Sequence, residues 1–176
     1  MPRRLLRDGQ IVIDEWLYVA EAVALTTVPL IVPFSQFQTE PKSWLARAGR
    51  LGAGRGGAEH LGVLLSPADK VEQLAPYLGH LALVAAEFPG PGEGRGYTQG
   101  RLLRERWNFK GELRATGYVR RDQVFFMARC GFSSFELPES ELEAAHTAFS
   151  TFSAAYQASN DQGLPLKLPR DIPANA

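Results

Sequence analysis

From about residue 59 onward, the chain alternates short apolar runs with segments that repeat their apolar positions at helical spacing. Apolar runs of about four to eight residues bounded by turn residues are typical of buried strands. Such strands are expected at 60–65, 81–88, 111–117 and 132–137. Amphipathic helices are expected between and after them, at 66–80, 97–107, 120–131 and 141–156.

The first third of the chain is less regular. The patterns favour strands at IVI (11–13) and VPLIVPF (28–34), a helix at DEWLYVAEAVAL (14–25) and a short helix at PKSWLARAG (41–49). The glycine-rich stretch 49–59 predicts a loop, and the proline-rich stretch 164–176 predicts an extended or disordered tail. Residues 1–163 are therefore expected to form a single α/β domain.

Helices that connect successive strands favour a mostly parallel sheet with right-handed helical crossovers. Both an open doubly wound sheet and a partial barrel satisfy this pattern. The open sheet is favoured, because the strand candidates are too few to close a parallel barrel of about eight strands.

The charges balance over the whole chain, with 19 Lys and Arg against 19 Asp and Glu. A neutral total argues against nucleic acid as a partner, because phosphate binding needs a basic excess. The basic residues are nevertheless uneven, and a dense group of them lies between residues 95 and 129. Its members are Arg95, Arg101, Arg104, Arg106, Lys110, Arg114, Arg120, Arg121 and Arg129. A local anion site is therefore compatible with the neutral total.

Cysteine and histidine usage limits the possible cofactors. The single cysteine, Cys130, excludes an internal disulfide and an iron–sulfur cluster held by this chain alone. The three histidines lack metal-ligand spacing, so neither a metal nor another cofactor is evident. No apolar stretch of about 18 residues predicts a membrane span, and no signal peptide pattern is present, so a cytoplasmic protein is expected.

The stretch FPGPGEGRGYTQ (88–99) follows a predicted strand and leads into a predicted helix. In it, Gly94 and Gly96 flank Arg95, and Tyr97 follows. The N–H groups at a helix start and a forked guanidinium both suit an oxyanion. The stretch lacks the Lys-Ser/Thr end of a phosphate loop and the dinucleotide glycine spacing. A mobile turn in which Arg95 pairs with Glu93 or Glu87, and a protein docking surface, are the alternatives.

Three predicted neighbouring strands carry a charged residue, namely Glu87, Arg114 and Glu136. Charge on a buried parallel strand is costly unless it is paired. Arg114 could lie between the two carboxylates and fix the strand register. Alternatively, the three residues form a pocket floor, with Arg114 as the ligand anchor and Glu87 or Glu136 as the acid or base.

Two further positions are candidates for a site. Asp122, followed by Gln123, begins the helix after strand 111–117, where Asp122 either caps the helix or faces the same rim as the glycine-flanked loop. Arg104 lies near the flank of helix 97–107, where it either faces solvent or reaches a partner.

Several short motifs occur in a fixed order: GRGY (94–97), LLRER (102–106), GELRA (111–115), RDQ (121–123) and RCGF (129–132). In this combination the chain resembles the bacterial family called domain of unknown function nine-three-four, most strongly over residues 61–137. The resemblance implies a role in sulfite reduction, because members are described as probable oxidoreductases of that process and are encoded beside sulfite reductase. Family members tend to carry Asp-Gly before Arg-Gly-Tyr, where this chain carries Glu93-Gly94.

Sulfite reduction needs an electron-carrying cofactor, and the sequence has no motif for one. We therefore expect an accessory protein of assimilatory sulfate and sulfite reduction. Its basic, glycine-flanked loop would dock sulfite reductase or another sulfate-assimilation enzyme, or hold a small oxyanion. One alternative is an oxidoreductase with a nonstandard site built from Arg95, Arg114, Glu87 and Asp122. Another is a phosphate- or nucleotide-binding α/β domain.

Overall fold

The computed structural model describes residues 3–19, 28–51 and 60–151, and within them a single eight-stranded sheet has the order β2-β1-β8-β7-β6-β5-β4-β3. The strands are β1 (Arg4–Arg7), β2 (Gln10–Ile13), β3 (Leu17–Tyr18), β4 (Leu30–Pro33), β5 (Leu61–Leu65), β6 (Leu83–Phe88), β7 (Glu112–Gly117) and β8 (Ser134–Phe135). The helices are α1 (Phe34–Thr39), α2 (Pro41–Leu51), α3 (Val71–Leu74) with the 3-10 helix η2 (Ala75–His80), α4 (Arg95–Glu105), α5 (Arg121–Arg129) and α6 (Glu139–Thr151).

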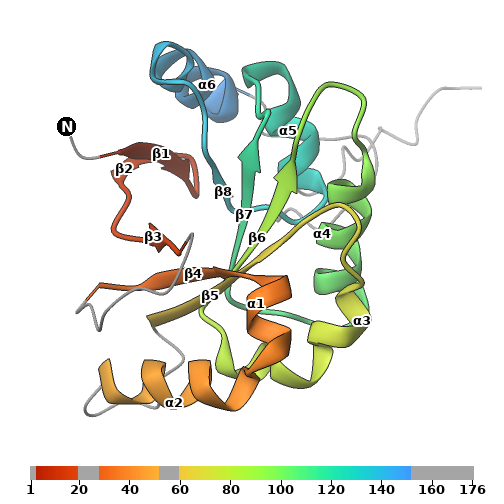
Figure 1. Cartoon of the computed structure of the whole chain (residues 1–176). Helices are drawn as coiled ribbons and strands as arrows, with labels where there is room; N and C mark the ends of the chain where they lie inside the picture. The colour runs from red at the N-terminus through yellow and green to blue at the C-terminus, as the bar shows by residue number, and fades with distance from the viewer. Residues whose placement is uncertain (1–2, 20–27, 52–59, 152–176) are drawn as a thin grey trace, which may run out of the picture.

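Strands β3 to β8 lie side by side in chain order, and each pairs in parallel with the next. Right-handed crossovers that always step in the same direction place their helices on one face of the sheet. The sheet curls into a half-barrel, with α4 and α5 on its outer side and β1 to β3 across from them (Figure 1). The predicted α/β fold is confirmed as a partial barrel. The open doubly wound sheet, which the sequence pattern favoured, is wrong, because it requires the strand order to reverse and helices to cover both faces.

The N-terminal segment extends the sheet beyond β8 with antiparallel strands. Strands β1 and β2 form an antiparallel hairpin, and β1 also pairs antiparallel with β8. The turn consists of Asp8 and Gly9, both with positive φ, which is the signature of a two-residue hairpin. Strand β1 was not predicted, and the helix expected at 14–25 is wrong where the structure describes it, because Leu17–Tyr18 form β3.

Successive side chains along each strand point alternately to the outer and the concave face of the sheet. The outer face and the helices share the main core, in which Val84, Leu113 and Ala115 are fully buried. A smaller apolar cluster of Ile31, Leu83 and Ala85 lies on the concave face, with Trp16, Tyr18 and Leu64 packed against it. On β7, Glu112, Arg114 and Thr116 lie on the concave face. This strand therefore places two charged side chains in the interior of the half-barrel.

Most predicted elements after residue 59 are present within a few residues of their expected bounds. The helix expected at 66–80 is an exception, because α3 begins only at Val71 and continues as η2 from Ala75. The side chain of Asp69 accepts a hydrogen bond from the backbone N–H of Ser66 and closes a turn before α3. Helix α1 was not predicted. Residues 52–59 of the glycine-rich loop, residues 20–25 and the tail 164–176 lie outside the described residues.

Candidate functional site

The most buried charge in the described part of the chain is Arg114, in the middle of β7. Its Nε and Nη2 donate to Glu112 Oε1 at 3.0 and 2.8 Å. Its Nη1 donates to both oxygens of Asp14 at 3.1 Å and to Glu136 Oε1 at 3.2 Å. Of the two carboxylates predicted to flank Arg114, Glu136 does so and Glu87 does not. The register explains this, because Glu87 lies opposite Thr116, beyond the level of Arg114.

Glu136 receives donors from several elements. Tyr18 Oη, from β3, donates to its Oε1 at 2.6 Å, and Thr116 Oγ1, from β7, donates to its Oε2 at 2.8 Å. Arg3 adds a weaker contact at 3.4 Å. Burial, followed by the negative charge of Glu136, raises the pKa of Tyr18. Tyr18 thereby connects β3, one edge of the curled sheet, to the chain just after β8.

The buried network balances its charges internally, and the exposed side chains of Arg3 and Arg7 close it toward solvent. Its members are Arg3, Arg7, Asp14, Tyr18, Glu112, Arg114, Thr116, Ser134 and Glu136. Arg3 pairs with Asp14, Arg7 lies 3.5 Å from Glu112, and Ser134 Oγ donates to Glu112 at 2.7 Å. Burial lowers the pKa of Arg114, but the charges of Glu112 and Asp14 outweigh burial and raise it. Paired buried charges of this kind fix which strands meet. The network joins β1, β3, β7 and β8.

The predicted anion loop follows β6 and leads into α4. Glu93 Oε1 accepts hydrogen bonds from the backbone N–H of Arg95 at 3.0 Å and from its Nε at 2.9 Å. Glu93 Oε2 accepts from Arg95 Nη2 at 2.7 Å. These hydrogen bonds lower the pKa of Glu93 to about 2. A carboxylate of the chain itself thus occupies the position at the helix start where an oxyanion would bind.

The residues around Arg95 have different tasks. A Cβ at Gly96 would lie 2.6 Å from the ring of Phe88, so this glycine permits α4 to pack closely on β6. Gly94, in contrast, has open space at its Cβ position. The ring of Tyr97 meets Phe88 edge-on, with centroids 5.0 Å apart, and lies 5.1 Å from the ring of Phe126. Tyr97 therefore links α4 to both β6 and α5, and burial raises its pKa.

The start of α5 differs from the prediction. Gln123 Oε1 accepts a hydrogen bond from the backbone N–H of Arg120 at 3.1 Å, and Arg120 is the residue before the helix. Asp122 lies in the first turn, where a carboxylate is favourable but is not the N-cap. The helix cap predicted at Asp122 is therefore wrong, because Arg120 is the N-cap and Gln123, the third residue of the helix, bonds back to its backbone N–H.

Arg104 is held inside the fold. Its Nε donates to the carbonyl oxygen of Gly131 at 2.9 Å, and its Nη1 donates to those of Phe109 at 2.5 Å and Gly111 at 2.9 Å. Burial lowers the pKa of Arg104. The guanidinium thus donates hydrogen bonds to backbone carbonyl groups that follow α4 and α5. These bonds hold the Arg104 side chain inside the fold.

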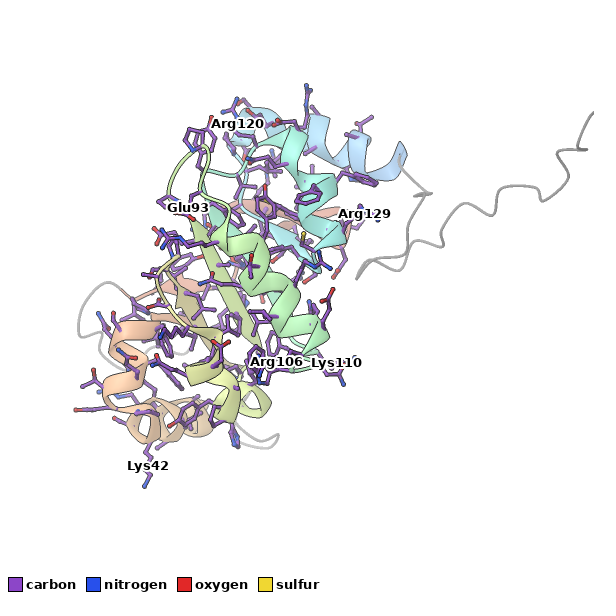
Figure 2. The ribbon with its side chains drawn as sticks, turned by 90° about the vertical axis from the view of Figure 1, so that its right-hand side faces the viewer. Lys42, Glu93, Arg106, Lys110, Arg120 and Arg129 are labelled. Atoms are coloured by element: carbon purple, nitrogen blue, oxygen red, sulfur yellow. The ribbon has the colours of Figure 1, made fainter. Side chains whose placement is uncertain are left out.

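The loops before α4 and α5 lie at the same edge, because both follow the carboxyl ends of adjacent parallel strands. In Figure 2, Glu93 and Arg120 lie toward the upper part of the molecule, and Arg106 and Lys110 lie at the lower end of α4. Arg114, however, makes its bonds on the concave face, away from α4 and α5. The structure therefore brings Arg95 and Asp122 to one rim but does not place Glu87, Arg114 and Asp122 in one site.

Two general features bear on possible chemistry. Within residues 3–19, 28–51 and 60–151, no three His, Cys, Asp or Glu side chains are grouped so that they could hold a metal ion. No helix in those ranges has the length and apolar character needed to cross a membrane.

Comparison with protein families gives a match. The sequence model of a family described as "Bacterial protein of unknown function (DUF934)" matches residues 62–167. No curated protein matches the chain. The matched region contains β6 to β8, nearly all of β5, the Arg95 loop and five of the nine residues of the buried network. The other four, Arg3, Arg7, Asp14 and Tyr18, precede it.

Proposed function

The chain belongs to the bacterial family of unknown function DUF934, and on that premise we propose that it is an accessory protein of assimilatory sulfate and sulfite reduction. It docks a partner enzyme through the Arg95 rim, which comprises Glu93, Gly94, Arg95, Gly96 and Tyr97. The partner is sulfite reductase or another enzyme of sulfate assimilation, as the family resemblance implies.

The observation that carries this proposal is the pairing of Arg95 with Glu93. An oxyanion would need the first N–H of α4 and the guanidinium, and Glu93 already holds both. The side chain of Arg95 is nevertheless 63% exposed, so the paired charges are displayed at the surface. A displayed, preoriented charge pair suits protein docking better than capture of a free anion.

The buried network supports an accessory role over a catalytic one. For Arg114 to bind a substrate anion, its guanidinium would have to leave Glu112, Asp14 and Glu136. That would remove the central cation from three largely buried carboxylates, at a large cost in free energy. The network thus acts as a scaffold, and the function lies at the surface.

A titration tests the docking. Purified protein is titrated into purified sulfite reductase by calorimetry, with Arg95→Ala as the test variant and Arg101→Ala as the matched control. Arg101 is also exposed on α4 and pairs with a glutamate, Glu105, at 3.2 Å. We expect Arg95→Ala to weaken binding markedly and Arg101→Ala to bind as the unchanged protein does. Equal affinities for both variants and the unchanged protein would contradict the proposal.

The same samples separate docking from oxyanion binding. Amide spectra are recorded with sulfite and with sulfate, and no specific shift is expected at Gly94 to Gly96 because Glu93 holds the site. Saturable shifts at these amides that disappear in Arg95→Ala would assign the loop to an oxyanion instead.

A further inference from the structure

The face formed by α4 and α5 carries a charge imbalance that the neutral total conceals. Between residues 93 and 131, nine Lys and Arg stand against four Asp and Glu, but Arg104 is held inside the fold and Arg114 and Glu112 lie on the concave face. Without these three, seven Lys and Arg stand against Glu93, Glu105 and Asp122, an excess of four positive charges, and Arg120 pairs with Glu141 of α6 at 2.6 Å. The rest of the chain therefore carries the compensating negative excess. In Figure 2, which looks onto α4, Arg120, Arg129, Arg106 and Lys110 are spread over this side of the molecule.

Two exposed aromatic side chains lie on the same segment. Phe126, on α5, is 56% exposed, and Tyr118, just before α5, is 41% exposed. The ring of Phe126 rests against Tyr97 at 5.1 Å, and the guanidinium of Arg120 lies 6.0 Å from the ring centre of Tyr118. Aromatic residues and arginine are enriched where proteins bind one another, and they carry much of the binding energy.

Phe126 is exposed on α5 although it is a large apolar side chain. Its neighbours Val124 and Met127 are buried in the core and hold the helix without it. Tyr97 connects Phe126 to the Arg95 rim, so the aromatic surface and the rim are continuous. Arg120 and Arg121 lie at the start of the helix that carries Phe126, and Asp122 lies one turn before Phe126. An exposed apolar ring beside basic groups fits a partner with an apolar recess next to acidic side chains.

We propose that this basic–aromatic face, comprising Tyr97, Tyr118, Arg120, Arg121 and Phe126, binds an acidic protein surface, with Phe126 as its anchor. The inference rests on the proposed function and extends it, because it gives the chemistry of the partner surface and enlarges the footprint beyond the Arg95 rim. Glu93 and Asp122 interrupt the basic groups, which disfavours a nucleic acid backbone as the occupant.

The first test uses sulfite reductase as the probe and compares Phe126→Ser with Ile13→Ser. Ile13, on β2, is 58% exposed and serves as a matched apolar control. Loss of an anchor residue is expected to weaken binding by about tenfold or more, and Ile13→Ser is expected to have no effect. Thermal unfolding checks that both variants stay folded. Binding that survives Phe126→Ser contradicts this inference alone, whereas no binding by the unchanged protein contradicts the proposed function.

A second test does not depend on the identity of the enzyme. Polyglutamate is added to the unchanged protein and to Arg121→Glu, and amide shifts are recorded at low and high salt. We expect shifts on α4 and α5 that weaken with salt and with Arg121→Glu. Shifts elsewhere, or none, overturn the inference. Tighter binding of duplex DNA than of polyglutamate at equal ionic strength would also overturn it and assign the face to nucleic acid.

Discussion

Arg114 and Arg95 form the same chemical pairing in two different surroundings. The side chain of Arg114 is fully buried among three carboxylates, whereas that of Arg95 is 63% exposed beside one. Removing one member of a buried ion group leaves uncompensated charge, which is strongly destabilising. An exposed pair is screened by water and contributes little to stability. The comparison assigns the buried network to the fold and leaves the exposed rim available for recognition.

The largest predicted effect follows from breaking the buried network. Arg114→Met removes the cation and leaves Asp14, Glu112 and Glu136 close together without it. We expect a loss of about 3–5 kcal/mol in the free energy of unfolding, measured by urea denaturation. Arg101→Met is the control, because Arg101 pairs only at the surface. A similar urea midpoint for the two variants would contradict the scaffold role of the network.

A smaller effect is expected when the network loses one neutral donor. Tyr18→Phe removes the hydrogen bond to Glu136, and we expect a loss of about 1–3 kcal/mol in the free energy of unfolding. Tyr118→Phe is the exposed control and should unfold as the unchanged protein does. If Tyr18→Phe is as stable as the unchanged protein, Tyr18 does not hold β3 against the network.

The raised pKa of Tyr18 adds an alkaline signature to that variant. A phenol with a pKa raised in the folded state stabilises the fold fully below its ordinary pKa of about 10 and loses that contribution as pH rises through the folded value. The unchanged protein should therefore lose stability above about pH 10 more steeply than Tyr18→Phe. Parallel pH profiles of the unfolding free energy would contradict this expectation.

The smallest predicted effect is a change in the titration of the Glu93 carboxyl group in the Arg95 rim. The pKa of Glu93 is lowered to about 2 from an ordinary 4.5, so its bonds to Arg95 are complete above 4.5 and are lost as pH falls through about 2. A carboxyl-carbon NMR titration should place the Glu93 midpoint near that lower value. In Arg95→Ala the midpoint should return to the ordinary value. An ordinary midpoint in the unchanged protein would show that the pair does not form in solution.

The sequence predicted the strands of the half-barrel better than its N-terminal segment. Strands β5 and β6 read as continuous apolar runs, which is how parallel strands buried on both faces appear. Strand β1 carries arginine at both ends, Arg4 and Arg7, and is short, so its pattern is weak. The Asp8-Gly9 pair was the signal that could have identified the β1–β2 hairpin.

The site was predictable in part. Arg114 stands out because charge is rare on a buried strand, but its partners depend on register and on distant chain segments. Glu112 could have been found from alternation along β7, since it shares a face with Arg114. Asp14 could not, because it lies 100 residues away and reaches Arg114 only when the sheet curls. The prediction that Glu87 pairs with Arg114 was wrong because the register of β6 against β7, which places Ala85 beside Arg114, cannot be read from either strand alone.

The most direct test compares two variants for their affinity to sulfite reductase and for their urea midpoints. The account predicts that Arg95→Ala loses affinity while its midpoint is unchanged. It predicts that Tyr18→Phe keeps its affinity while its midpoint falls. The opposite result, with Arg95→Ala binding normally and folded Tyr18→Phe failing to bind, would contradict the account and move the functional site to the concave face of the half-barrel.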